Sequence, residues 1–385
     1  MRKKVTCLLA GVLVAAGLAA PVPAQADPVG GTGWTLVFAD DFNGTAVDTG
    51  KWNFRTDVKG YSAQRAQNVT VANGLMSINL KQESYGGKNF TGGGLISKQP
   101  FRYGYYETRA KLNDGAGWHT SFWAMAGSGV TTFGLERRTE IDGFEIDSTS
   151  SPALLRNIHS GVHAWNGSTD MHNVGTTYNS GLDLRQWHTY GFEWSEASVK
   201  FYVDDVLKYT AAYAPSEWIH DYVNIWLTSI GYGTSPDPAF LPSAAQFDYI
   251  RYWQKDYYVD NDGPAAYGYS ETGTWLDSTL TGWTHGSPTR YAACHTGGHT
   301  ATWRPNLGAS GTYAVYAYKI AHSGGDPNAR YDVAGTTTYV NQTSGVSGWV
   351  SLGTHSFPSG STGFVKLTAS GSGCARADAV KFVRV

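Results

Sequence analysis

The sequence predicts an all-β protein made of two consecutive β-sandwich domains. Short runs rich in Val, Ile, Thr, Tyr and Phe recur between Gly, Asn, Asp and Ser residues, as in chains of strands joined by turns. Few segments have the apolar spacing of an amphipathic helix. A series of such runs ends near residue 255 and a new series begins directly after it. The simplest architecture for each series is a pair of packed sheets.

The strands predicted for the first domain follow one another between short polar turns. They are Asn68–Val71, Met76–Leu80, Gly104–Leu112, Ser198–Val203, Val223–Ile230 and Phe247–Trp253. Asn73-Gly74 and Asp204-Asp205 stand between such runs, and these residue types are favoured in tight hairpin turns. Tyr257 opens the second series, which continues to Val385. Because no long Pro- or Ser-rich linker separates the two series, we expect the domains to pack closely.

The chain begins with the composition of a secretory signal peptide. Arg2-Lys3-Lys4 gives a positive start, Leu8–Ala20 an apolar segment and Ala24-Gln25-Ala26 a cleavage site of small residues. The apolar segment is short for a membrane span. We therefore expect a secreted, extracellular protein with no membrane attachment in its mature form; the alternative is an uncleaved membrane anchor. The predicted organisation is residues 1–26 as signal peptide, 27–255 as first domain and 256–385 as second domain.

Composition excludes one class of partner and favours another. The formal net charge is -2 and no basic tract is present, which argues against nucleic acid because phosphate binding needs clustered Lys and Arg. The chain contains 14 Trp, 24 Tyr and 15 Phe with only 16% charged residues. Many of these rings fill cores, but a nearly neutral, aromatic-rich and Gly-rich secreted chain is typical of sugar-binding surfaces. We expect a polysaccharide partner and a monomeric protein.

Two cysteines remain once Cys7 has left with the signal peptide. In a secreted chain, Cys294 and Cys374 favour one disulfide. The alternative is a metal site formed by Cys294 with His295 and His299, but a second pair of ligands is lacking. We therefore predict a disulfide and no metal site.

Three carboxylates in segment 138–145 have a spacing that indicates chemistry. Side chains alternate along a strand, so Glu140 and Asp142 lie on one face. Glu145 is one residue out of phase, and a β-bulge at Gly143 would return it to that face. Three acids on one face predict glycoside cleavage, which needs a pair of carboxyl groups. The alternatives are a surface charge cluster with the neighbouring arginines and a calcium site.

Around these acids the chain resembles glycoside hydrolase family 16, whose signature is Glu-x-Asp-x-Glu or the bulged Glu-x-Asp-x-x-Glu. The resemblance covers most of residues 34–254. Its further matching segments are Trp34–Phe42, Asn68-Val69, Asn73–Ile78, Tyr103–Lys111 and Gly117–Trp123. It implies a jelly-roll (concanavalin-like) β-sandwich enzyme that cuts β-linked polysaccharides such as laminarin, mixed-linkage glucan, agar and carrageenan.

The resemblance also implies a role for each acid. Glu140 is expected to be the nucleophile, Glu145 the acid/base, and Asp142 the residue that shares a proton with Glu140 and orients it. A retaining glycosidase of this kind needs two carboxyl groups roughly 5 Å apart. Repulsion from Glu140 is expected to raise the pKa of Glu145 and keep it protonated for the first step. This chemistry requires no cofactor, and a structural calcium ion is left open.

Six further residues are predicted to contact the substrate. They are Trp118, Trp123, Trp165, His163, Asn68 and Arg65. The tryptophans can stack on sugar faces, with ordinary core packing as the alternative. His163 matches a histidine that borders the acid/base in the family, and His159 is its rival. Asn68 and Arg65 precede a hairpin where family members place polar groups that contact sugar.

The chain departs from the glucanase pattern at several positions. It has Trp118-His119 where many β-1,3-glucanases have Trp-Pro, and segment 133–139 replaces a second Trp-Pro pair. Trp226–Gly233 replaces an Asn-containing, double-glycine stretch. The first substrate choice is β-1,3- or β-1,3/1,4-glucan. The alternatives are a β-galactan of the agar, porphyran or carrageenan type, and a non-catalytic lectin-like protein that binds polysaccharide; a transglycosylase would use the same residues.

The second domain resembles golvesin C-terminal-like domains, which look like β-sandwich carbohydrate-binding modules. The matching segments are Val259–Asp262, Thr272–Trp275, Thr300–Leu307, Gly311–Tyr313, Trp349–Gly353 and Ala377–Val380. The resemblance implies polysaccharide tethering, which raises the local substrate concentration. The alternative is a structural or protein-contact module. The loop that starts at Asp260 is not an EF-hand, because Pro264 and Ala265 occupy required positions.

Overall fold

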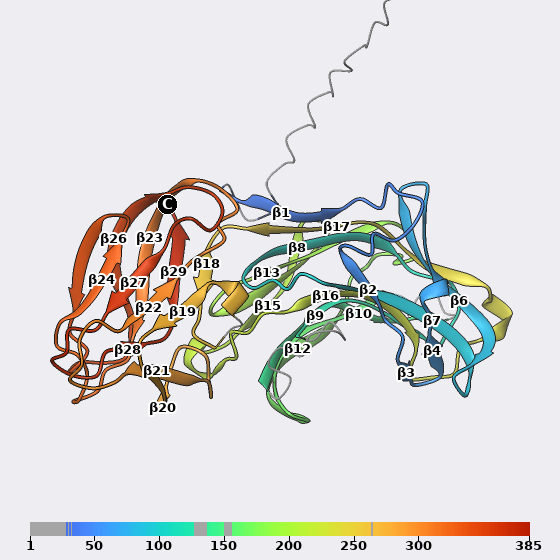
Figure 1. Ribbon diagram of the computed structural model, residues 1–385. Coiled ribbons are helices and arrows are strands. Elements are labelled where there is room, and N and C mark those ends of the chain that lie inside the picture. The colour runs from blue at the N-terminus through green and yellow to red at the C-terminus, as the bar shows by residue number, and fades with distance from the viewer. Residues whose placement is uncertain (1–27, 30, 32, 127–136, 150–155, 263–264) are drawn as a thin grey trace, which may run out of the picture.

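The computed structural model describes residues 28, 29, 31, 33–126, 137–149, 156–262 and 265–385 (Figure 1). The predicted signal peptide and most of segment 133–139 lie outside these residues. The described chain consists of β-strands with four short 3-10 helices, η1 (Ala66–Asn68), η2 (Pro215–Glu217), η3 (Pro238–Phe240) and η4 (Ala265–Tyr267). None of its helices has the length and apolar character needed to span a bilayer.

The first domain is a sandwich of two antiparallel sheets, as predicted. The sheet that carries the acids, here called the site sheet, has the strand order β12 (Thr169–Asn179), β11 (Asn157–Asn166), β10 (Arg137–Asp147), β9 (Trp118–Met125), β16 (Asn224–Gly231), β7 (Lys88–Ser97) and β2 (Trp52–Phe54). In Figure 1 this sheet curves beneath the other one, with β12 toward one end and β7 toward the other.

The second sheet of this domain, the outer sheet, covers the back of the site sheet. Its order is β15 (Val206–Ala212), β14 (Ser198–Val203), β13 (His188–Trp194), β8 (Gly104–Lys111) and β17 (Ser243–Gln254), and β17 then pairs with both β1 (Thr35–Asp40) and β6 (Leu75–Tyr85). β5 (Val69–Ala72) pairs with β6 in an antiparallel arrangement. β3 (Val58–Lys59) pairs with β4 (Ser62–Gln64), and β4 runs parallel to β7. Both predicted hairpin turns are present, with positive φ at Asn73, Gly74, Asp204 and Asp205.

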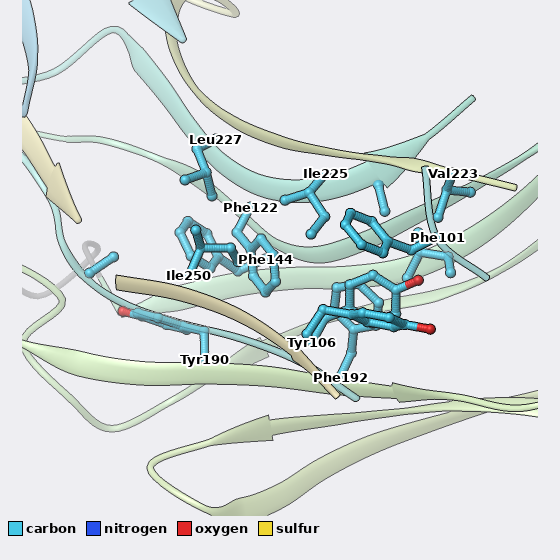
Figure 2. Close-up of a cluster of buried hydrophobic side chains, with 14 of the residues drawn as sticks. Phe101, Tyr106, Phe122, Phe144, Tyr190, Phe192, Val223, Ile225, Leu227 and Ile250 are labelled. Atoms are coloured by element: carbon cyan, nitrogen blue, oxygen red, sulfur yellow. The ribbon is translucent and has the colours of Figure 1, made fainter. Parts of the chain in front are cut away.

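Aromatic side chains fill the space between these two sheets (Figure 2). Phe122 on β9 lies 5.3 Å from Phe192 on β13, and Phe144 on β10 lies 4.4 Å from Tyr190 on β13, measured between ring centroids. Such pairs add about 0.5–1.5 kcal/mol each beyond the burial of their area. The inward residues of β10 thereby fix that strand, so that its other face carries the acids at a defined position.

The second domain is a smaller β-sandwich, as predicted. One sheet has the order β18 (Tyr257–Val259), β29 (Val380–Arg384), β23 (Gly311–Lys319) and β26 (Gly348–Phe357). The other, here called the five-stranded sheet, has the order β19 (Tyr269–Thr272), β22 (Thr300–Trp303), β27 (Val365–Thr368), β24 (Ala329–Val333) and β25 (Thr336–Val340). A third, short sheet contains β20 (Trp275–Thr281), β21 (Pro288–Ala292) and β28 (Arg376–Ala377).

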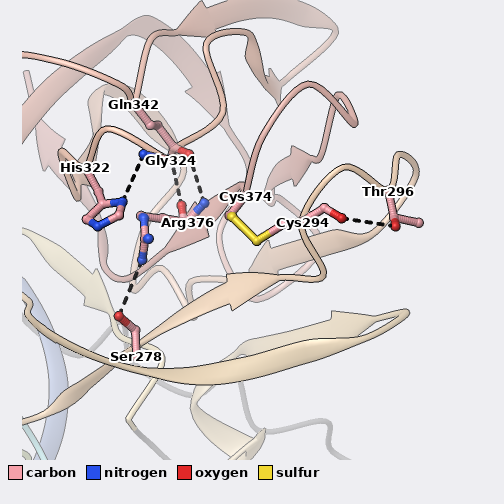
Figure 3. Close-up of a disulfide and its surroundings, with 8 residues drawn as sticks. All are labelled: Ser278, Cys294, Thr296, His322, Gly324, Gln342, Cys374 and Arg376. Atoms are coloured by element: carbon pink, nitrogen blue, oxygen red, sulfur yellow. Dashed lines mark hydrogen bonds between the residues drawn. A yellow bond between two sulfur atoms is a disulfide. The ribbon is translucent and has the colours of Figure 1, made fainter.

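Cys294 and Cys374 form the predicted disulfide (Figure 3). It joins the end of β21 to the segment before β28, across 80 residues of chain. Closing a loop of that length in the unfolded chain contributes about 4.5 kcal/mol in the chain-entropy model. Beside it, the Gln342 side chain bonds both the N–H and the C=O of Arg376. The disulfide and this amide together fix the segment that leads into the last strands.

The two domains share an interface, which confirms the expectation of close packing. Glu196, in the turn between β13 and β14, accepts hydrogen bonds from Trp283 Nε1 at 2.9 Å, Trp349 Nε1 at 2.5 Å and Lys381 Nζ at 2.9 Å, all from the second domain. Trp283 also belongs to the core of the first domain. Cutting the chain at residue 255 would expose that core, so the second domain is better tested by point substitutions than by deletion.

Candidate active site

A β-bulge in β10 brings the three acids to one side of the strand. Asp142 is the partner of Gly161 on β11, whereas Glu145 is the partner of His159, two residues away on β11 but three residues away on β10. The additional residue restores the phase of Glu145 relative to Glu140 and Asp142. The bulge predicted from the spacing is therefore confirmed.

The bulge requires a glycine at position 143. A Cβ there would lie 2.8 Å from the Phe192 ring and 2.9 Å from the backbone oxygen of Phe122. Neither group can move away, because both are packed in the core. Ile141 and Phe144 on either side point into that core and are fully buried, so the acids are left on the opposite face.

Glu140 and Glu145 line one pocket of about 230 Å³ on the open face of the site sheet. The other residues that line it are Arg55, Lys59, His119, Ser121, Trp123, Thr228, Ile230 and Tyr232. A second pocket, of about 560 Å³, also includes Glu145 and Tyr232 and extends over Asp147, His159 and Thr177. Glu145 therefore stands where two adjoining pockets meet, as a group acting on the middle of a long ligand would.

Glu140 is held by Trp165 on the neighbouring strand β11. Trp165 Nε1 donates to Glu140 Oε2 at 2.6 Å. The indole is itself fixed by stacking on His163, with ring centroids 5.5 Å apart and an interplanar angle of 17°, and by the Arg138 guanidinium 5.5 Å from its centroid. Burial raises the pKa of Glu140, and this outweighs the opposite effects of His163 and Trp165. Trp165 and His163 thus lie beside Glu140 and Asp142, but neither lines the pocket with the glutamates, and their contact with substrate stays a prediction.

Asp142 lies buried between the two glutamates. Its side chain is in contact with His163, with 3.4 Å between Asp142 Oδ2 and His163 Nε2, and His163 Nδ1 bonds Asp170 Oδ2 at 2.8 Å. Burial is the main cause that raises the pKa of Asp142, to about 8. Asp142 therefore binds a proton more readily than an ordinary aspartate. This fits a residue that shares a proton with its neighbour.

Glu145 is bonded to a histidine that bridges two carboxylates. His119 Nε2 lies 2.9 Å from Glu145 Oε1, and His119 Nδ1 lies 2.8 Å from Asp147 Oδ1. Burial lowers the pKa of His119, but the two carboxylates outweigh it and raise the pKa to about 9. For Glu145, burial acts to raise the pKa, and the hydrogen bond and charge of His119 lower it more, so the net shift is downward.

The expectation that Glu140 raises the pKa of Glu145 is therefore wrong for the free protein. The cationic His119 is in direct contact with Glu145. Glu140 has a raised pKa of its own and so binds a proton more readily than an ordinary glutamate. Attraction to the near charge exceeds repulsion from the acid further along the strand.

Trp123 lies in the pocket, as predicted, and has an aromatic partner that was not predicted. Trp226 on β16 is its direct cross-strand neighbour, with ring centroids 4.6 Å apart and an interplanar angle of 32°. Trp123 Nε1 donates to Thr228 Oγ1 at 3.1 Å, which fixes the ring. The two indoles form an aromatic floor beside the acids.

Trp118 lines the second pocket, but its ring is too buried to stack on a sugar, which corrects its assignment. Its side chain is only 1% exposed and packs in the core between the sheets. The reason is strand alternation: Trp118 and Trp123 are five residues apart on β9, so they face opposite sides. His119 and Ser121 have the phase of Trp123 and face the pocket.

Asn68 and Arg65 are also corrected, because neither lines the pocket with the glutamates. Asn68 is 1% exposed, and its Nδ2 donates to the backbone oxygen of Gly92 at 3.1 Å. Arg65 pairs with Glu83 at 2.5 Å and lies over the Tyr85 ring at 4.3 Å from the centroid. Both hold the loop before β5 in place, and this gives them a structural role.

The site prediction missed further residues at the two pockets. They are His119, Arg55, Lys59 and Tyr232 in the first pocket, Asp147 in the second, and Trp226 beside Trp123. Two had a usable signal, since His119 is four residues before Trp123 and Asp147 two after Glu145, both in phase on their strands. Arg55 directly follows the very short β2 and Lys59 ends the very short β3, where strand periodicity gives no information.

One group in the site has the composition of a metal site. Asp142, His159 and His163 bring one ligand atom each to within 4.8 Å of one another. His163 is already bonded to Asp142 and Asp170, and His159 Nδ1 is 3.2 Å from Thr177 Oγ1. We assign His163 to the hydrogen bonding of Asp142 and Asp170 and His159 to that of Thr177, and the absence of a required cofactor stays a prediction.

Comparison with known proteins matches each of the two domains to a protein family. Residues 34–254 match the family model described as beta-porphyranase A-D, GH16 domain, and residues 258–384 match the Golvesin C-terminal domain. A beta-glucanase of Rhodothermus marinus is 25% identical over 256 residues, covering 57% of this chain and 85% of that protein. A kappa-carrageenase of Pseudoalteromonas carrageenovora is 26% identical over 291 residues, covering 64% and 70%. The crystal structure of a non-specific endo-β-1,3(4)-glucanase is 26% identical, covers 58% of this chain and 92% of its own, and has a TM-score of 0.50.

Proposed function

The chain belongs to glycoside hydrolase family 16, and on that premise we propose that it is a retaining endo-β-glycosidase acting on a β-linked polysaccharide. The observation that carries this proposal is the bulged strand β10, which presents Glu140 and Glu145 to one pocket beside an aromatic floor. The open pocket on a curved sheet suits a long chain cut internally. An intact pair of acids also argues against the lectin-like alternative.

We propose that the reaction is a double displacement at the anomeric carbon. Glu140, oriented by Trp165 and Asp142, attacks the anomeric carbon while Glu145 protonates the leaving glycosidic oxygen. Water then attacks the anomeric carbon of the glycosyl-enzyme, Glu145 takes the proton from that water, and Glu140 departs. Two inversions at one carbon give net retention. A transglycosylase would differ only in the acceptor of the second step.

The first candidate substrate is β-1,3- or β-1,3/1,4-glucan. Beta-glucanases and an endo-β-1,3(4)-glucanase are among the relatives of this chain. The tilted pair Trp123 and Trp226 offers apolar faces to neutral sugar rings.

A sulfated β-galactan is the second candidate, and a charge observation favours it. Lys59 is exposed at the pocket, with Nζ 5.5 Å from the centroid of the Tyr232 ring. Arg55 lines the same pocket over Trp226, although Asp57 neutralises much of its charge. Cations beside the acids suit an anionic sugar. The family model that matches the first domain is that of beta-porphyranases A-D, and a kappa-carrageenase is among the relatives.

A substrate panel separates these candidates. We expect reducing ends to be released from laminarin and lichenan, and the first-formed product to keep the β-configuration in a time-resolved NMR spectrum. Activity confined to porphyran, agarose or κ-carrageenan would replace the first candidate with the second. An α-configured first product, or binding without release from any glycan, would contradict the proposed mechanism.

We further propose that the protein is secreted, acts as a monomer and needs no cofactor for the reaction. The support for secretion is the charge and apolar pattern of residues 1–26. The support for a cofactor-free reaction is that two carboxyl groups and water supply every proton and bond in the steps above.

We propose that residues 256–385 bind polysaccharide through the outer face of the five-stranded sheet. Tyr339 on β25 is 64% exposed and lies directly across from Arg330 on β24. Arg330 and Lys366 flank Asp332, and with Phe364 they line a pocket of about 530 Å³. Exposed rings beside paired polar groups suit a sugar, which needs both a flat apolar face and hydroxyl partners.

Tyr339→Ala is the test of this surface. We expect it to weaken the binding of the full chain to insoluble glycan by roughly tenfold, since an aromatic contact contributes about 0.5–1.5 kcal/mol beyond its area. Activity on soluble glycan should not change. The matched control is Leu276→Ala, another exposed side chain of this domain, on β20. Unchanged binding of Tyr339→Ala in a sedimentation assay would contradict the proposal.

A further inference from the structure

The bridge formed by His119 restricts where the acid proton of Glu145 can be. Both ring nitrogens of His119 contact a carboxylate oxygen, Nε2 with Glu145 Oε1 at 2.9 Å and Nδ1 with Asp147 Oδ1 at 2.8 Å. When both carboxylates are ionised, each contact needs an N–H donor, so the ring is an imidazolium. Glu145 Oε1 is then an acceptor, and a proton to be donated has to sit on Oε2.

The surroundings hold this arrangement in place. His119 is on β9 directly opposite Asp147 on β10, so the pairing follows from the strand register. The Tyr232 ring packs edge-on against the imidazole, with centroids 5.6 Å apart and an interplanar angle of 62°. The His119 side chain is 16% exposed, which strengthens its charge interactions relative to those in water.

We propose that His119, anchored by Asp147, is a positioning residue for Glu145: it fixes the acid proton on Oε2 and stabilises the carboxylate left when that proton passes to the leaving oxygen. The inference deepens the proposed function and rests on the role of Glu145 in it. In the first step the proton moves from Oε2 to the glycosidic oxygen, that oxygen's bond to the anomeric carbon breaks, and the Glu140 oxygen forms its bond. In the second step the proton of the attacking water returns to Oε2. His119 keeps both of its own protons throughout.

A fixed cation beside Glu145 makes it a stronger acid and a weaker base. This agrees with the lowered pKa of Glu145, for which burial acts in the opposite direction and His119 outweighs it. The raised pKa of His119, about 9, keeps it charged through the neutral range. Protonated Glu145 is needed for the first step, so kcat/KM falls as the pH rises through its pKa. A lowered pKa places that fall at a lower pH.

Other charged groups around this pair also influence it. From the strands and loops packed against the site they are Glu140, Asp142, Arg138, His159, His163, Lys59 and Arg55. Burial lowers the pKa of His159, so it is mostly neutral near neutral pH. His163 is bonded to Asp142 and Asp170 and not to Glu145. His119 is therefore the cation in direct contact with Glu145 among the described residues.

The test is His119→Gln, which keeps a neutral donor and removes the charge. We expect the alkaline limb of kcat/KM on a soluble glycan to move to higher pH, because the pKa of Glu145 rises. We also expect the plateau to fall by roughly tenfold or more, the scale of a charge-assisted hydrogen bond. On the 2,4-dinitrophenyl glycoside of the same oligosaccharide, whose leaving group needs no proton, kcat/KM should match the wild type. Asp147→Asn should move the limb in the same direction by a smaller amount.

The matched control is His188→Gln on β13 of the outer sheet. His188 has a comparable contact, with Nδ1 2.7 Å from Asp204 Oδ2, and lies outside both pockets. Its substitution should leave the pH profile unchanged. An unmoved alkaline limb in His119→Gln, or an equal loss on both substrates, would overturn the inference. A wild-type protein without activity on any glycan would instead refute the proposed function itself.

Discussion

Glu140→Gln is expected to remove glycan hydrolysis almost completely, with a loss in kcat on the order of 10⁵- to 10⁶-fold, the scale of losing a catalytic nucleophile. The amide is not a nucleophile, so no glycosyl-enzyme forms. The amide oxygen of the substituted side chain can still accept the hydrogen bond that Trp165 Nε1 donates to Glu140, which preserves the local structure. The loss is measured with purified protein on the best glycan of the panel, and the fold is checked by its Tm.

A smaller residue at position 140 provides a second, chemical readout. Glu140→Ala leaves space for an external anion. We expect azide to attack the anomeric carbon of a 2,4-dinitrophenyl glycoside once only, giving a glycosyl azide of inverted configuration. The matched control is Glu193→Gln on the outer sheet, which removes the partner of Lys200 far from the pocket. Full hydrolytic activity in Glu140→Gln would show that another residue attacks the sugar.

The positions of the acids were predictable because they depend on local chain geometry. The period of two along a strand, together with one glycine, is enough to place Glu140, Asp142 and Glu145 on one face. The same rule, applied to Trp118 and Trp123, places the Trp118 ring on the core side of β9. The expectation that the Trp118 ring contacts substrate was wrong because it ignored the position of Trp118 relative to Trp123 along β9. The phase of a side chain along β9 therefore predicts whether its ring can reach the open face of the site sheet.

The electrostatics of Glu145 were not predictable from its own strand. The residue that determines its pKa is His119, which lies 26 residues earlier in the chain and meets it only through the pairing of β9 with β10. The sequence of β10 alone indicates only the repulsion between its three carboxylates, which would raise the pKa of Glu145. The same limit applies between domains: the contacts of Glu196 with Trp283, Trp349 and Lys381 span 87 to 185 residues of chain.

Glu145→Gln should separate the two substrate classes. On a polysaccharide we expect kcat/KM to fall by about 10²- to 10⁴-fold, the usual contribution of general acid catalysis. The alkaline limb of the pH profile should disappear, since the group whose deprotonation causes it is gone. On a 2,4-dinitrophenyl glycoside, formation of the glycosyl-enzyme should remain near the wild-type rate, because that leaving group departs without a proton.

The second step of this variant gives the decisive measurement. Without a base to activate water, the glycosyl-enzyme should accumulate, so dinitrophenol appears in a burst followed by slow turnover. Azide needs no base and should restore turnover, giving a glycosyl azide of retained configuration because Glu140 has already inverted the centre once. Retention here and inversion in Glu140→Ala would together assign the two glutamates. Equal losses on both substrates, with no burst and no rescue, would mean that Glu145 maintains the shape of the pocket and transfers no proton.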